Sequence, residues 1–596
     1  MVGFYTGNAR NGLHVHQQSS PPVSRFSGRG LRQPWLLLVE LSLFVLIAIA
    51  STWPLARHLA TSVPLGTERV ATVPLFTSWS VWWNCDRLGH LYSNYWDAPI
   101  FAGCADSFAF SEPLPLTAVA APVYWLSDSP AAACNTLLIL ALTLNGWSAF
   151  RLLLRIHQRW LLAVLGGVMI ELLPFVHHEI AVFQLVPLCG VIWTLDSLHR
   201  WMCRPALSHA VMTGVCCGVT YLLCSYYGLF LVLLLGLVVP CFLCRELRRG
   251  QTWCLVAACA CSCLLVASPV VVTQLRVDRE RNMARSRPNV QRFSAALSDY
   301  LVAPWPSVWS RDRAARVPTA RLFSLYPGNV SVSLGILGTL LGLRYRRSRR
   351  WTAFCVAILV AALLLSLGPR LSIAGWTPYD PLADWIPGFA QARSLFRFGM
   401  FVQLMNAQLE VIGLGTLLRI ARARFPNRGR RLLTAMIVAM GVAAAIELWP
   451  LPQRLFELPA QSNETAWIAW LRDQTPTDSV VACLPFPTGK SEQDYESTAL
   501  WMYAATYHKR QLANGYSAYF PPSFLRLKAT LASFPNDAST HALRASGVEF
   551  CVVERAAEMN EGLQDAVGWQ RVFTDRRANV DIYQLAASPS DKTSAD

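Results

Sequence analysis

The stretch that decides the fold is "PLGTERVATVPLFTSWSVWWNCDRLGHLYSNYWDAPIFAG", residues 64–103, which follows the first long apolar run of the chain. It combines closely spaced tryptophans with the carboxylates Glu68, Asp86 and Asp97. Tryptophan is enriched at membrane–water interfaces, whereas ionisable residues beside lipid are rare and mostly functional. The segment is therefore expected to form a structured loop at a membrane surface.

The remainder of the chain is typical of a polytopic membrane protein. Of its 596 residues, 53% are hydrophobic and only 15% are charged, compared with about 25% charged in an average soluble protein. Eleven apolar runs approach the roughly 20 residues that a helix needs to cross a bilayer. These runs are 35–55, 131–153, 160–176, 180–198, 208–223, 226–244, 252–273, 330–343, 351–368, 398–418 and 432–450.

The net charge of +16 indicates orientation rather than nucleic-acid binding, because the arginines punctuate apolar segments. Residues 1–33 contain four arginines and no acid, so the N-terminus is expected in the cytoplasm. The short, proline-rich run 113–127 is expected to be a re-entrant or surface-lying helix. If it crossed the membrane, the later arginine clusters would lie outside, against the positive-inside rule.

Three parts follow from this topology. Residues 1–33 are expected to be a disordered cytoplasmic tail. Residues 34–452 form a polytopic domain with outer loops 56–130, 274–329 and 369–397. Residues 453–596 alternate short strand patterns ("SVVACLP", "VEFCVV", "NVDIYQL") with helical patterns, which is typical of a soluble α/β domain. The fold class is thus mostly α, with about eleven transmembrane helices and an extracytoplasmic C-terminal α/β domain.

The opening loop also holds the first candidate for chemistry. Trp79, Trp82 and Trp83 are three and four residues apart, so they share a helix face that is expected to lie in the headgroup layer. Asp86 follows that stripe on the same side. It is either a solvated acid or a general base held over lipid headgroups. Cys85 and Cys104 share the loop and are close enough in sequence for a disulfide in an oxidising compartment.

Two further clusters lie at predicted outer ends of spans. His177, His178 and Glu179 adjoin a proline-bent helix end, where they form either a proton-transfer site or an interfacial pair. No third well-spaced ligand accompanies them, so no metal site is assigned. Arg393 and Arg397 are four residues apart at a helix entrance, an arrangement that suits a phosphate but also anchors helix ends.

The order of these parts resembles the GT-C class of integral-membrane glycosyltransferases. The chain is similar in particular to a group of uncharacterised bacterial membrane proteins near that class. The segments that carry this resemblance are "FSAALSDYLVAP" (293–304), "WIPGFAQARSLFRFGMF" (385–401) and "HKRQLANGYSAYFPPSFLRLKATLASFP" (508–535). They come from both the membrane part and the soluble part, so the resemblance extends over most of the chain.

The resemblance implies transfer of a sugar from a polyprenyl-phosphate donor, with a carboxylate of the first outer loop as base. Related proteins have Gly-Asp early in this loop, where this chain has Gly66-Thr67-Glu68. Glu68 is therefore the first candidate for the base and Asp86 the second. The donor and acceptor would be bound by outer arginines together with three further residues: Arg276, Arg279, Arg393, Arg397, His178, Glu179 and Tyr516.

The resemblance implies no certain cofactor and leaves a divalent metal open. The expected partners are membrane lipid, a lipid-linked sugar and a glycan, lipid or protein acceptor, in the cell (inner) membrane. Two other functions stay open from the sequence. One is a transporter or flippase for a lipid or glycolipid, and the other is a non-catalytic assembly protein of the envelope.

Overall fold

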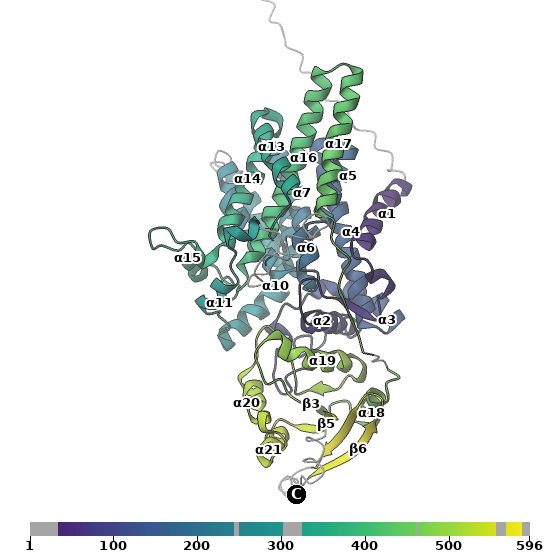
Figure 1. Cartoon of the computed structure of the whole chain (residues 1–596). Coiled ribbons are helices and arrows are strands. Elements are labelled where there is room, and N and C mark those ends of the chain that lie inside the picture. Colours follow the sequence, from purple (N-terminus) through teal and green to yellow (C-terminus); the bar gives the residue numbers. More distant parts are fainter. Residues whose placement is uncertain are drawn as a thin grey trace, which may run out of the picture.

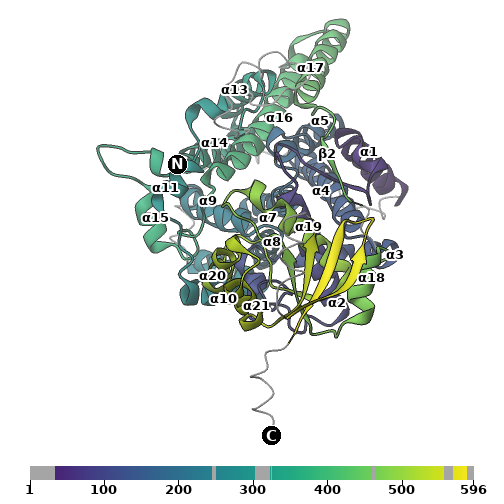
Figure 2. The ribbon, with the colours of Figure 1, turned by 60° about the horizontal axis from the view of Figure 1, so that its bottom comes forward.

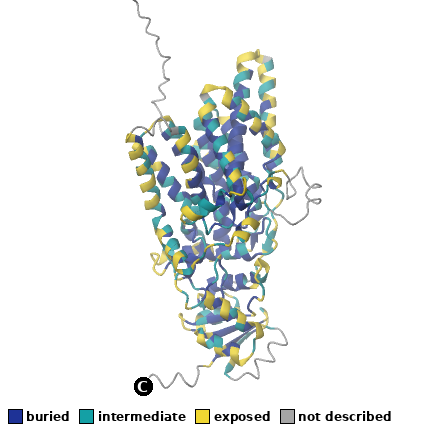
Figure 3. Ribbon diagram, turned by 90° about the vertical axis from the view of Figure 1, so that its left-hand side faces the viewer, coloured by how far each residue is buried: buried dark blue, intermediate teal, exposed yellow. Residues whose placement is uncertain are grey.

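A computed structural model describes residues 34–243, 250–301, 323, 325–459, 463–555 and 568–586. The predicted cytoplasmic tail 1–33 and much of the predicted loop 274–329 lie outside the described residues. The described residues form a bundle of long helices above a smaller α/β domain (Figure 1). Buried side chains fill the interior of both parts, and exposed ones follow the outer helices (Figure 3).

Each predicted apolar run corresponds to a helix of the bundle. Seven of the described helices are long and apolar enough to cross a membrane, and three shorter ones are apolar. The number of eleven spans therefore stays a prediction. The helices are α1 (Pro34–Ser51), α4 (Pro130–His157), α5 (Trp160–Glu171), α7 (Cys189–Cys203), α8 (Leu207–Leu223), α9 (Ser225–Leu243), α10 (Gly250–Arg281), α13 (Asn329–Arg344), α14 (Arg346–Ser366), α16 (Gly399–Arg424) and α17 (Asn427–Leu448).

Two helix boundaries differ from the predicted ones by eight residues or more. The span expected at 180–198 becomes α7, which starts at Cys189, two residues after Pro187. Proline disfavours helix in the residue before it, so the chain enters the helix only beyond this point. At the other extreme, α10 runs eight residues past its predicted end to Arg281, because "TQLRVDRER" continues the helix into polar sequence.

The segment between α1 and α4, expected to be an outer loop, is folded rather than a simple loop. It contains strand β1 (Ser62–Pro64), helix α2 (Thr72–Gly89) and the short helices η2 (Ser107–Phe110), η3 (Pro115–Ala120) and α3 (Ala121–Ser127). The last two cover the run 113–127, whose Val119, Trp125 and Leu126 are exposed. The segment is thus a pair of short helices with an apolar outer face.

The C-terminal domain is built on a five-stranded mixed sheet in the order β4-β3-β5-β7-β6. Strand β3 is parallel to β4 and β5, whereas β7 is antiparallel to both β5 and β6. The elements are β3 (Val480–Leu484), β4 (Gln511–Leu512), β5 (Val548–Glu554), β6 (Trp569–Asp575) and β7 (Val580–Leu585), with α18 (Ala466–Gln474), α19 (Glu496–His508), α20 (Pro522–Thr530) and α21 (Asp537–Ala545). A further strand, β2 (Leu455–Glu457), pairs with β1 and joins this domain to the segment between α1 and α4.

Helix α2 lies between the bundle and the C-terminal domain, with α19 packed against it (Figure 1). Figure 2 shows the C-terminal domain in front of the bundle. The position of α2 corrects the expectation for the tryptophans. Trp79, Trp82 and Trp83 are 0%, 2% and 5% exposed, so they cannot lie among lipid headgroups. Trp82 Nε1 donates to the Tyr124 hydroxyl at 3.1 Å, and Trp83 Nε1 donates to the Tyr95 carbonyl at 2.9 Å. Cys85 and Cys104 are free thiols.

The burial of Trp79 leads to a stability prediction. We expect Trp79→Ala to lower the free energy of unfolding by about 3–5 kcal/mol, because it removes the ring that Phe76 and Phe108 pack against. Thermal unfolding of the purified protein measures this change. Trp385→Ala is the control, since that ring is 82% exposed and its loss should matter little. Equal stability of the two variants would indicate that Trp79 lies at the membrane surface and not in a packed interior.

Candidate functional site

Glu68 is held in a turn between β1 and α2 that is fixed to the segment around His178. The Glu68 N–H donates to the Leu65 carbonyl at 2.8 Å, and the Thr67 N–H donates to the His178 carbonyl at 3.1 Å. Gly66 has a φ of +50°, and a Cβ there would stand 2.5 Å from the same His178 oxygen. Only glycine fits this position, so the Gly66-Thr67-Glu68 turn fixes the backbone from which the Glu68 side chain projects.

The C-terminal domain holds the start of α2 beside this turn. The Ala71 N–H donates to Glu496 Oε1 at 2.7 Å, and Thr72 Oγ1 donates to the Glu492 carbonyl at 2.7 Å. Glu492 opens the 3-10 helix η9 (Glu492–Tyr495). These contacts bring a residue more than 400 positions away in sequence to Glu68. The site is therefore built by both parts of the protein.

The carboxylates of Glu68, Glu179 and Glu492 interact electrostatically at this site with the guanidinium groups of Arg393 and Arg397. Burial, followed by the charges of Glu492 and Glu179, raises the pKa of Glu68 to about 8, while Arg393 and Arg397 oppose the rise. Burial raises the pKa of Glu179 to about 7; the charge of Arg397 opposes this rise, and the charge of Glu492 adds to it. With a pKa about one unit above neutral pH, Glu68 can both take up and release a proton there, as general acid–base catalysis requires.

The arginines lie at the entrance of α16. Arg397 is in the 3-10 helix η8 (Leu395–Phe398), which leads directly into α16, and its guanidinium lies 4.3 Å from the centre of the Tyr226 ring. Within the described residues its Nε is buried and has no hydrogen-bond partner. Arg393 lies 4.9 Å from the Phe293 ring centre. A buried N–H donor next to a helix N-terminus is well suited to an anion.

Arg285 completes the basic side of the site. Its backbone N–H donates to the Ala390 carbonyl at 3.2 Å, and its Nη2 donates to the Ala518 carbonyl at 2.7 Å. Burial and the neighbouring Arg393 charge lower the pKa of Arg285. Arg285 therefore connects the loop before α16 to the C-terminal domain and adds positive charge beside Arg393.

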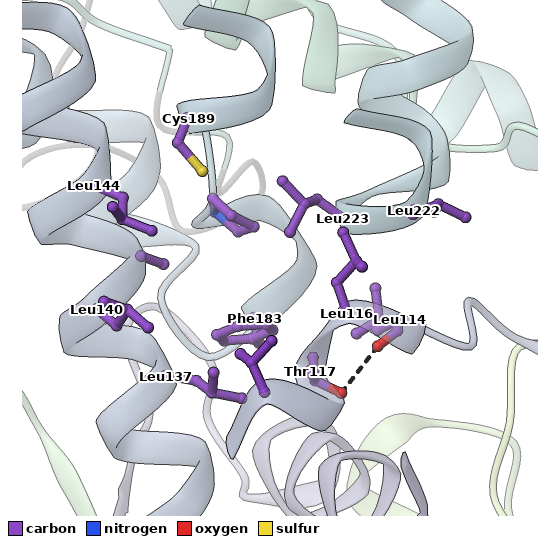
Figure 4. A pocket seen from close by; sticks show the side chains of 13 residues that line it. Leu114, Leu116, Thr117, Leu137, Leu140, Leu144, Phe183, Cys189, Leu222 and Leu223 are labelled. Carbon is purple, nitrogen blue, oxygen red and sulfur yellow. Dashed lines mark hydrogen bonds between the residues drawn. The ribbon is translucent and has the colours of Figure 1, made fainter. Parts of the chain in front are cut away.

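An apolar groove adjoins the site through Glu112. Glu112 Oε2 accepts the Ser225 N–H at 2.9 Å, and the charge of Arg397 offsets the burial that raises the pKa of Glu112. Leu114 is two residues after Glu112, and Leu223 is two residues before Ser225. Both leucines line a narrow groove of about 70 Å³ (Figure 4). Its other walls are mostly apolar and come from η3, α4, the segment before α7, the first residue of α7, and α8.

Two further candidates from the sequence, Tyr516 and His178, lie at the site. Tyr516 borders the site, because the charges of Glu492 and Glu68 add to the burial that raises its pKa. Its ring also packs against Phe76 and Tyr495, both at 5.6 Å between centroids. The His178 carbonyl anchors the Glu68 turn, as described above. Tyr516 and His178 thus have structural contacts at the site.

Asp86, Arg276 and Arg279 are placed differently. Asp86 is at the far end of α2, roughly 20 Å along the helix from its start, and accepts from Arg87 Nε at 3.0 Å. Arg276 Nη2 donates to Asp106 Oδ1 at 2.7 Å. Arg279 is exposed on α10. The structure therefore separates the two carboxylate candidates and brings Glu68, not Asp86, to Arg393 and Arg397.

Two participants, Glu112 and Glu492, were not predicted from the sequence. Glu112 precedes the proline-rich run and Glu492 lies in the acidic stretch "SEQDYE", so neither has a motif of its own. Among the described residues, no group of three or more His, Cys, Asp or Glu side chains is arranged to hold a metal ion.

Solved structures share this architecture. The arabinofuranosyltransferase AftD from Mycobacteria matches with a TM-score of 0.54 and 16% sequence identity, over 95% of this chain and 42% of that one. The chain therefore shares its fold with this solved membrane protein. ArnT from Cupriavidus metallidurans, solved with bound undecaprenyl phosphate, gives a TM-score of 0.42 and 12% identity, over 94% of this chain and 99% of that one. No protein-family model and no curated protein matches the sequence.

With its apolar helices, this chain is an integral membrane protein. It spans less than half the length of AftD. The shared fold does not by itself identify a reaction.

Proposed function

We propose that the protein is a membrane glycosyltransferase that moves a sugar from a polyprenyl-phosphate donor to an extracytoplasmic acceptor. The observation that carries the proposal is the meeting of Glu68 with Arg393 and Arg397 at one site. One carboxylate with a raised pKa and two guanidinium groups supply a base and an anion clamp. ArnT, solved with undecaprenyl phosphate, and AftD, an arabinofuranosyltransferase, are consistent with this class of reaction.

In this reaction Glu68 takes the proton of an acceptor hydroxyl. The hydroxyl oxygen forms a bond to the anomeric carbon of the donor sugar, and the bond from that carbon to the phosphate oxygen breaks. The released polyprenyl phosphate carries the electron pair and stays beside Arg393 and Arg397. Their positive charge stabilises the negative charge that develops on the leaving oxygen.

The apolar groove supports the lipid part of the proposal. It begins two residues from the Glu112–Ser225 contact, and Glu112 in turn interacts with Arg397. A phosphate at Arg397 would therefore place the first isoprene units near Leu114 and Leu223. The orientation proposed from the arginines puts this site and the C-terminal domain on the outer face, with the N-terminus in the cytoplasm.

The test is transfer of radiolabelled sugar from a polyprenyl-phosphate donor by the purified chain in detergent or liposomes. We expect transfer to an added envelope glycan that depends on the donor lipid. Movement of the labelled lipid between leaflets without transfer would replace the proposal with a flippase. Neither transfer nor lipid movement by well-folded protein, together with stable capture of an envelope component, would indicate an assembly protein.

The raised pKa of Glu68 predicts the pH dependence of the reaction. The base must be deprotonated, so kcat/KM should rise with pH, reach half its maximum near pH 8, where Glu68 is half deprotonated, and level off above it. Glu492→Gln removes a negative charge that raises this pKa, so the rise should move to lower pH. The control is Asp473→Asn on the exposed face of α18, which should leave the profile unchanged. If the pH dependence of kcat/KM in Glu492→Gln were the same as in the unmodified protein, Glu68 would not be the titrating base.

A further inference from the structure

Arg397, the proposed donor-binding arginine before α16, lies against the first turn of α9. Its guanidinium is 4.3 Å from the centre of the ring of Tyr226, which is the second residue of that helix. One turn later, the Phe230 ring stacks on the ring of Phe398, the residue after Arg397, with 3.7 Å between the centroids. The position of the guanidinium therefore depends on how the first turn of α9 is held against η8.

The first turn of α9 is held by a carboxylate from the segment between α1 and α4. Glu112 Oε2 accepts the N–H of Ser225, the first residue of α9, at 2.9 Å and from 113 positions away in the sequence. The first N–H groups of a helix have no partner within it, and a carboxylate there also interacts favourably with the helix dipole. Tyr227 is held separately, because its hydroxyl donates to the Leu185 carbonyl at 2.7 Å. Loss of the Glu112 contact should therefore loosen the first turn without detaching the helix.

Glu112 acts on Arg397 without a direct hydrogen bond through the two atoms that are free. The charges of the two side chains interact. However, Glu112 Oε1 and Arg397 Nε are both buried and have no hydrogen-bond partner among the described residues. The charge of Arg397 acts on Glu68 as well. Glu112 can thus influence the donor site either through the position of α9 or through its own charge.

We propose that Glu112 is a positioning residue for the donor phosphate, because by capping α9 it holds the Tyr226 ring against the Arg397 guanidinium. The inference rests on the proposed function and adds a residue outside the reacting groups. A guanidinium held on an aromatic ring is restricted before the phosphate arrives, so less freedom is lost on binding. If the charge of Glu112 mattered instead, its removal would make Arg397 more attractive to an anion, and binding would become tighter.

Binding of farnesyl phosphate to the full chain in detergent, measured by isothermal titration calorimetry, tests the proposal. Farnesol has the same apolar chain without the phosphate and reports the apolar contribution alone. Glu112→Gln keeps an oxygen for the Ser225 N–H, so its affinity should stay within about twofold of the unmodified chain. Glu112→Ala removes that oxygen and should weaken farnesyl phosphate binding roughly tenfold, as for one lost hydrogen bond to a charged group, with no change for farnesol.

A double variant separates positioning from general destabilisation. If Glu112 acts through Arg397, Glu112→Ala should weaken binding roughly tenfold in the unmodified chain and much less in the Arg397→Gln background. The matched control is Glu447→Ala, which removes a carboxylate that accepts the Asn329 and Val330 N–H groups at the start of α13, at 2.7 and 2.8 Å. This control should lower the unfolding temperature and leave the affinity for farnesyl phosphate unchanged.

The outcomes distinguish the inference from the proposed function. An equal loss with and without Arg397, or an equal loss in Glu447→Ala, would reduce Glu112 to a purely structural residue. Tighter binding by both Glu112 variants would show that its charge, not its cap, acts on the site. No binding of farnesyl phosphate by the unmodified chain would refute the donor site and the inference together. Binding without sugar transfer would refute the proposed reaction alone, and the ranking of the variants would still decide the role of Glu112.

Discussion

Glu68→Gln is expected to lower the rate of sugar transfer by about 10²–10⁴-fold, the usual contribution of a positioned general base. Gln preserves the size of the side chain and cannot accept the acceptor's proton. Because the donor is bound mainly by the arginines, the loss should appear in kcat while donor KM changes little. The rate of transfer from a polyprenyl-phosphate sugar measures it.

The control for this variant is Asp86→Asn. Asp86 has the same side-chain chemistry in the same segment of sequence, but it is paired with Arg87 at the other end of α2. Its replacement should leave transfer within a few-fold of the unmodified protein. If instead Asp86→Asn lost activity and Glu68→Gln kept it, the assignment of the base would be reversed.

Arg397→Gln is expected to lower kcat/KM by about 10²–10³-fold, as for loss of one preorganised donor to a developing negative charge. Its buried Nε has no partner within the described residues, so a phosphate can use it without breaking an existing hydrogen bond. Steady-state kinetics with varied donor measure this loss. Arg397→Lys should recover only part of it, since lysine retains the charge and loses the planar fork.

Arg276→Gln is the matched control for Arg397→Gln. Both arginines were candidates from the sequence, but Arg276 is paired with Asp106. It should therefore leave donor binding unchanged. Because Arg397 packs on Tyr226, size-exclusion and thermal unfolding must show that each variant is folded. A folded Arg397→Gln protein with normal donor kinetics would separate this guanidinium from the donor phosphate.

Much of the fold follows from hydrophobic patterning, and the exceptions have physical reasons. Apolar runs predicted every helix of the bundle, because length and hydrophobicity are local properties. The tryptophan stripe of α2 was misassigned because the same three- and four-residue spacing suits a membrane surface and a buried interface. What decides between them is α19, whose Glu496 binds the Ala71 N–H across 425 positions of sequence. No local pattern contains that information.

The site was predictable to a similar extent. Glu68, Glu179, Arg393 and Arg397 were candidates from the sequence, and the structure brings them together. Glu492 could not be found, because the C-terminal domain reaches the site only through its docking on α2. Asp86 is the reverse case, since it is close to Glu68 in sequence but lies near the other end of α2.

The most direct test of the account is a structure of the chain with bound polyprenyl phosphate, determined by electron cryo-microscopy. Phosphate density is expected within hydrogen-bond distance of Arg393 or Arg397, close to Glu68, with the isoprenoid passing toward Leu114 and Leu223. Phosphate density away from both arginines would show that they do not bind the donor.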